Sequence, residues 1–133
     1  MENRVGDKTK EIDSYLEELE SFLPESLEAY KKQLDKKAAC ERYFEKIVEA
    51  VVDLAFLIIK KKKLKSPDND KHAFEILENS NLLSHELSER LQDAKSMRNI
   101  IAHEYGEIDD EKVFHAVTEE LIPDTKKFLG VVG

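Results

Sequence analysis

Apolar residues recur at helical spacing along almost the whole chain, and strict alternation of apolar and polar residues is almost absent. Four glycines and three prolines among 133 residues leave room for few tight turns, so long helices must dominate. The pattern therefore predicts an all-α protein. The expected helices cover, in approximate residue numbers, 7–22, 27–34, 36–62, 71–78, 85–105 and 110–128.

Several residues mark where these helices begin and end. Ser26 and Ser84 are suitable N-caps, and Asp109 or Asp110 begins the last helix. Gly106 ends the helix before it. Pro123 predicts a kink or an interruption within the last helix, because proline lacks the amide proton that helix propagation needs.

The helix expected over 36–62 carries apolar residues on two neighbouring faces, so it needs cover from more than one side. We expect residues 1–133 to form a single domain, an up-and-down bundle of four to five helices. An apolar arc this wide also favours a symmetric dimer.

Composition limits the classes of function. Hydrophobic residues make up 41% and charged residues 38%, which indicates a folded domain and not a disordered one. Cys40 is the only cysteine, so a disulfide within one chain and a cysteine zinc site are both excluded, and a reducing cytoplasm fits. We expect no membrane span, since the longest apolar run, 55–59, is far too short. The net charge of −8 counts against a nucleic-acid binder.

The segment from Arg98 to Gly106 concentrates the side chains with chemistry. It reads R-x-x-x-x-H-x-Y, with Asn99 directly after the arginine, His103 and then Tyr105. Arginine stays charged and forks onto phosphate oxygens, and histidine both takes and gives a proton near neutral pH. These residue types suit the cleavage of a phosphodiester without a metal or a cofactor.

On an ideal helix, His103 lies about 140° from Arg98, whereas Ala102 lies at about 40° and Tyr105 at about −20°. The small Ala102 leaves room for a phosphate on this polar face. Because Arg98 and His103 diverge, three arrangements remain open. The long arginine arm sweeps across, the helix deforms before Gly106, or a second copy of the motif completes the site across a dimer interface.

This motif resembles the HEPN superfamily, and its spacing and tyrosine resemble the HepT branch of ribonuclease toxins. The resemblance extends over residues 7–129. It implies a homodimer with two motifs facing one cleft, and an MNT-type nucleotidyltransferase antitoxin that neutralises the toxin and attaches AMP to Tyr105. It also implies endonucleolytic cleavage of RNA, by attack of a ribose 2′-OH on the adjacent phosphorus. His103 then acts as general base or acid, Arg98 stabilises the charged phosphorane, and Asn99 orients the phosphate or the imidazole. DNA lacks the 2′-OH and should not be cut.

A second interpretation is a helical module without catalysis that binds and regulates a nucleotidyltransferase. The acidic net charge and the lack of aromatic residues near the basic run 60–65 favour it, whereas the intact motif favours the ribonuclease. Asp53 and Glu49 lie in the apolar helix 36–62, where they either pair with Arg98 or Arg42 or simply face water. Of the two, we expect Asp53 to approach the site.

Overall fold

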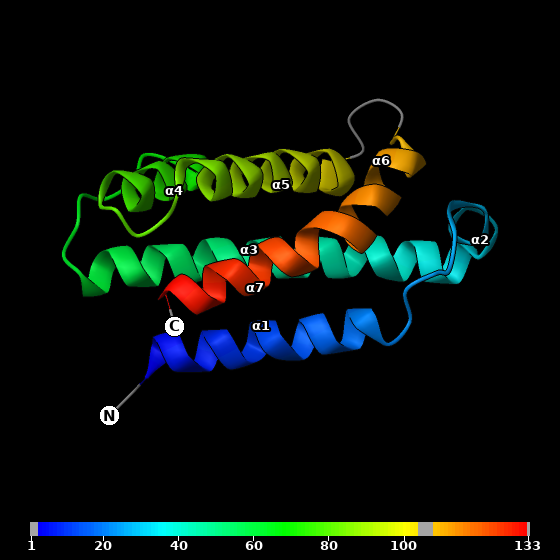
Figure 1. Cartoon of the computed structure of the whole chain (residues 1–133), viewed down its shortest axis with the longest axis horizontal. Coiled ribbons are helices and arrows are strands. Elements are labelled where there is room, and N and C mark those ends of the chain that lie inside the picture. The colour runs from blue at the N-terminus through cyan, green and yellow to red at the C-terminus, as the bar shows by residue number, and fades with distance from the viewer. Residues whose placement is uncertain (1–2, 104–107, 133) are drawn as a thin grey trace.

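The computed structural model describes residues 3–103 and 108–132, and every regular element within those ranges is a helix (Figure 1). No helix in the described ranges is long and apolar enough to cross a membrane. The elements are α1 (Arg4–Glu20), α2 (Leu27–Lys32), α3 (Leu34–Lys61), α4 (Asp70–Asn79), α5 (His85–His103), α6 (Asp110–His115), the π-helical turn η1 (Ala116–Glu120) and α7 (Leu121–Val132).

Helix α3 runs through the middle of the bundle and supplies eleven of its buried residues. Helix α1 packs along one side of α3, α4 and α5 pack together on another, and α7 crosses between them (Figure 1). This cover on several sides is what the wide apolar arc of α3 predicted, because each apolar face needs a partner to exclude water. The prediction of an all-α helical bundle is confirmed.

Side-chain caps set most helix starts. The hydroxyl of Ser26 accepts from the amide of Ala29 at 3.1 Å, and that of Ser84 accepts from the amide of Leu87 at 3.0 Å, as the sequence predicted. Asp109, one of the two candidates, caps α6. Helix α1 begins earlier than expected, at Arg4, because Asn3 caps it through the amide of Gly6.

Pro123 was expected to kink or interrupt the last helix, and α-helical geometry is interrupted just before it, by the turn η1. The chain stays helical from Asp110 to Val132, and Pro123 lies inside α7. A proline ring clashes with the carbonyl four residues earlier, which here belongs to Glu119. That carbonyl lies in the wider π-helical turn η1, so the structure meets the proline by widening the helix and not by ending it.

Candidate functional site

The last two turns of α5 carry Arg98, Asn99, Ala102 and His103. Tyr105 and Gly106, which the motif also includes, lie outside the described residues. Helix α5 thus holds the cation, the amide and the imidazole on one rigid element, as the sequence predicted.

Arg98 is largely buried, with 21% of its side chain exposed, and it extends toward α3. Its Nη2 lies 3.5 Å from Oε2 of Glu49, a carboxylate that is itself mostly in water. Its Nε is buried and has no hydrogen-bond partner within residues 3–103 and 108–132. A buried donor without an acceptor is unfavourable, so this guanidinium is positioned to gain from an oxygen that a ligand would bring.

A groove between α3 and α5 contains this arginine. Asp53 lines the groove too, but its carboxylate lies 3.7 Å from Nζ of Lys8 on α1, and the ion pair of Arg98 is with Glu49. Partial burial raises the pKa of Asp53 above its usual value; Lys8 opposes this and Glu49 adds to it. Asp53 thus approaches the site as expected, but Glu49 lines the groove too, and it is Glu49 that forms the ion pair with Arg98. The groove is lined by Glu49, Val52, Asp53, Phe56, Asp70, Lys95 and Arg98.

Asn99 lines a second groove, beside the start of α4, together with Asn69, Lys71 and two residues that the first groove shares. The shared residues are Lys95 and Asp70, whose Nζ and Oδ2 are 3.0 Å apart. This ion pair lies between the two grooves, so Arg98 lines one groove and Asn99 lines the groove beside it.

Lys95 and Asp70 were not predicted as part of the site. Lys95 lies three residues before Arg98, on the same helical face, which is the one signal in the sequence that points to it.

Ala102 and His103 are exposed at the end of α5. His103 thus lies on the outer surface while Arg98 points inward to α3, in keeping with the wide angle that separates them on an ideal helix. A phosphate bound at Arg98 and an imidazole at the surface suit a substrate that lies along the outside of α5.

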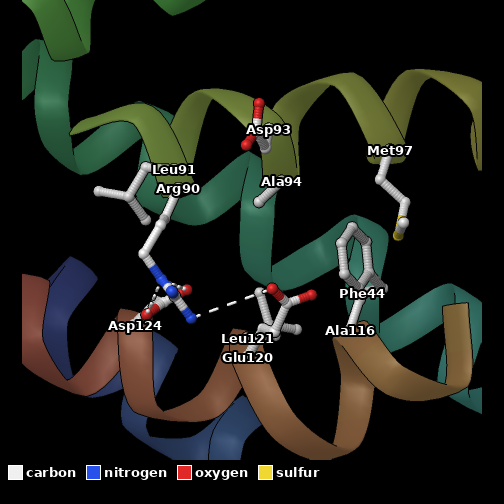
Figure 2. Close-up of a pocket in the computed structure, with 10 residues that line it drawn as sticks. All are labelled: Phe44, Arg90, Leu91, Asp93, Ala94, Met97, Ala116, Glu120, Leu121 and Asp124. Carbon is white, nitrogen blue, oxygen red and sulfur yellow. Dashed lines mark hydrogen bonds and ion pairs between the residues drawn. The ribbon is translucent and has the colours of Figure 1, made fainter. Parts of the chain in front are cut away.

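The side of α5 that faces α7 holds a different polar contact, which the sequence did not predict. There Nε of Arg90 donates to both carboxylate oxygens of Asp124 on α7, at 2.9 and 3.0 Å (Figure 2). A small cavity of about 80 Å³ lies beside this pair, lined largely by apolar residues such as Phe44 and Met97. Because Arg90 is bound by its partner and the cavity is small, the polar grooves on the other side of α5 suit a large charged substrate better.

The chain is similar to proteins of one known family. The model of the family described as "Ribonuclease HepT-like" matches residues 12–132. A curated protein of Aphanizomenon flos-aquae, named tRNA nuclease HepT, is 30% identical over 107 residues, which cover 80% of this chain and 73% of that one. The mRNA nuclease HepT of Shewanella oneidensis is 32% identical over 84 residues, covering 63% of this chain and 62% of the relative.

Among solved structures, the fold is similar to that of the tri-AMPylated Shewanella oneidensis HEPN toxin in complex with its MNT antitoxin. The TM-score is 0.90 at 23% identity, over 99% of this chain and 98% of that one. At this identity the likeness demonstrates a shared fold.

Proposed function

Since the chain belongs to the HepT-like ribonuclease family, we propose that it is a metal-independent endoribonuclease toxin in which Arg98 and His103 carry the chemistry. The observation that carries this proposal is the state of Arg98. Its guanidinium is held in a groove with a buried, unpaired Nε, on the same helix as an exposed histidine. A phosphate oxygen would satisfy this donor.

The reaction follows from these positions. His103 accepts the proton of a ribose 2′-OH, the 2′-oxygen bonds to the adjacent phosphorus, and the bond from phosphorus to the 5′-oxygen breaks. The leaving 5′-oxygen takes up a proton from protonated His103 or from water, so the products end in a 2′,3′-cyclic phosphate and a 5′-OH. Arg98 stabilises the negative charge on the phosphorane, and Asn99, facing the adjoining groove, orients the phosphate.

We further propose that two copies form a two-fold homodimer in which the motifs face one cleft. The inward position of Arg98 and the outer position of His103 leave room for a second copy to complete each site. Light scattering should then give twice the 15.4 kDa of one chain at micromolar concentration. A monomer under those conditions would refute the dimer.

Regulation by an MNT-type nucleotidyltransferase is the third part of the proposal. AMP attached to Tyr105 adds a bulky anion seven residues after Arg98 in the sequence, where it competes with RNA for the guanidinium. The structure of the tri-AMPylated toxin with its MNT antitoxin supports this mode of control. After co-expression with the cognate nucleotidyltransferase, intact-mass measurement should find AMP on Tyr105, and Tyr105→Phe should escape inhibition.

Cleavage of RNA in EDTA tests the catalytic proposal. The purified chain should cut transfer RNA or single-stranded RNA, leave 2′,3′-cyclic ends and spare DNA. His103→Ala should lower the rate by about 10²-fold or more, the usual scale for loss of a general acid or base. His115→Ala is the matched control, because His115 is also exposed but lies on α6. If the wild type cuts RNA no faster than the background rate, the enzyme is ruled out and a binding module is favoured; if His103→Ala cuts as fast as an active wild type, His103 is not the general acid or base.

A further inference from the structure

The C-terminal end of α3 carries an unusual density of positive charge. Lys60 to Lys63 and Lys65 are exposed, and among the described residues none of them has a carboxylate partner. The whole chain has a net charge of −8, so this concentration runs against its overall balance. Arg4 of α1 lines a surface hollow with Lys60 and Lys61. We name these six residues the basic end: Arg4, Lys60, Lys61, Lys62, Lys63 and Lys65.

The basic end continues the face of α3 that lines the groove with Arg98. Glu49, Asp53 and Phe56 line the groove with Arg98, and together with Lys60 they fall within about 60° on an ideal helix. Eleven residues separate Glu49 from Lys60, which corresponds to roughly 17 Å along the axis. At a rise of about 3.4 Å per nucleotide in one strand, that length spans roughly five phosphates.

Phe56 lies between the motif and the basic end. Its ring is half-buried and lines the groove with Arg98. Nucleic-acid bases stack on such rings whatever their identity. The sequence places no aromatic residue within the run 60–65, yet the helix brings this one onto the path between that run and Arg98.

Three carboxylates also line the groove, and each has a cation close by. Glu49 is paired with Arg98 at 3.5 Å, and Asp53 with Lys8 at 3.7 Å. Asp70 is paired with Lys95 at 3.0 Å. The groove is therefore close to neutral, and positive charge dominates only where it reaches the basic end.

The backbone at Lys63 is a second, independent observation. Its φ of 56° lies in the left-handed region, directly after the C-cap of α3, where glycine or asparagine is usual. The amide of Leu64 donates to the carbonyl of Ile59 at 2.9 Å and closes the helix in this conformation. A lysine here is strained, and such strain is often associated with a functional role.

We propose that the basic end binds the backbone of a single RNA strand whose scissile phosphate lies at Arg98, with a base stacked on Phe56. This inference rests on the proposed ribonuclease function and adds a second point of attachment. The lysines contact phosphates roughly five nucleotides from the cut, so they select for RNA long enough to reach them. They take no part in the bond-breaking step.

A pair of charge-removing substitutions tests the attachment. Lys60→Gln/Lys61→Gln is compared with Lys31→Gln/Lys32→Gln, an equal change of charge on α2 at the opposite end of α3 (Figure 1). Binding is measured in the His103→Ala background, with labelled single-stranded RNA of about 16 and about four nucleotides. The first pair should weaken binding of the longer RNA about tenfold and flatten its log–log salt dependence by about 1.4. Binding of the shorter RNA, and the behaviour of the α2 pair, should change little.

Two single substitutions separate binding from folding. Lys63→Gly relieves the strained backbone, so Tm should rise by about 2–4 °C while affinity for the longer RNA falls. Phe56→Leu keeps an apolar side chain but removes the ring, and should weaken binding about fivefold or more. A purely structural helix end would show the rise in Tm without the loss of affinity.

The outcomes distinguish this inference from the proposed function. If RNA is cut but both pairs bind it equally, the basic end is not an RNA site and the catalytic proposal stands. If the wild type does not cut RNA but Lys60→Gln/Lys61→Gln selectively weakens RNA binding, the basic end is an RNA site and the proposed catalysis is wrong. Normal RNA binding with loss of the nucleotidyltransferase complex would assign the basic end to that protein and overturn the inference.

Discussion

Arg90 and Arg98 lie on the same helix, eight residues apart, and they are held in opposite ways. Arg90 makes two short hydrogen bonds, at 2.9 and 3.0 Å, to the buried carboxylate of Asp124 (Figure 2). Arg98 is the more buried of the two, yet the ion pair that it makes with a described residue is long, at 3.5 Å, and involves the exposed Glu49. The cation with the less accessible side chain is the one with the weaker partner.

The difference indicates two uses of one residue type. A guanidinium matched by a bidentate carboxylate ties two helices together, and any ligand would have to displace that carboxylate. A guanidinium with a buried, unpaired Nε retains binding capacity that the fold does not use. We therefore infer that Arg90 contributes to stability and that Arg98 serves the proposed function. Loss of activity from a mutation of Arg90, or loss of stability from a mutation of Arg98, would contradict this comparison.

Arg98→Met should give the largest effect, and it should lower RNA cleavage while leaving stability nearly unchanged. Methionine keeps an unbranched apolar stem but removes the charge and the fork. We expect RNA cleavage to fall by about 10²–10³-fold, the scale for losing an electrostatic stabiliser of the transition state. The free energy of unfolding, measured in urea, should change by less than about 1 kcal/mol, because an unsatisfied donor is removed with the charge. A large loss of stability would make Arg98 a structural residue like Arg90.

Arg90→Met should give a smaller effect and confine it to stability. It leaves the Asp124 carboxylate, whose side chain is 9% exposed, without its partner on α5. We expect a loss of about 2 kcal/mol in urea unfolding, below the range for fully buried pairs because Arg90 is itself partly in water. Cleavage by the folded protein should be unchanged.

The double variant Arg90→Met/Asp124→Leu is the control for this change. It removes both charges, so much of the lost stability should return. If the double variant is as unstable as the single one, the loss comes from packing around Phe44 and Met97 and not from the unpaired carboxylate.

The two arginines also show which features of the structure could be predicted from the sequence and which could not. Apolar spacing and cap residues predicted the helices because they depend on neighbours three or four positions away. The motif could be found for the same reason, since Arg98 to His103 lie on one helix. The partners of the arginines are on other helices: Glu49 is 49 positions before Arg98, and Asp124 is 34 positions after Arg90.

Two further details have the same physical origin. Asp53 lines the groove with Arg98 as expected, but Glu49 forms the ion pair, because that choice depends on how α5 is placed against α3, and Lys8 of α1 lies beside Asp53. Pro123 was expected to kink or interrupt its helix, and the interruption takes the form of the π-helical turn η1 just before it, a form that the sequence did not indicate. Neither the lateral packing of helices nor a local change in helix pitch follows from hydrophobic spacing alone.

Glu49→Gln should give the smallest effect, and it tests most directly whether the partner of Arg98 differs in role from the partner of Arg90. The carboxylate is 60% exposed and 3.5 Å from the guanidinium, so the pair contributes at most about 1 kcal/mol, and urea unfolding should hardly change. If the guanidinium of Arg98 binds a phosphate of the RNA, the carboxylate of Glu49 competes with the RNA for it. Its neutralisation should then tighten RNA binding by up to about fivefold, the equivalent of that energy. Glu28→Gln removes another carboxylate that is mostly exposed, paired with Lys32 at 2.7 Å on α2, and controls for the general gain from reduced negative charge. Weaker cleavage at unchanged affinity would instead mean that Glu49 positions Arg98 much as Asp124 holds Arg90, and the distinction between the two arginines would be one of degree.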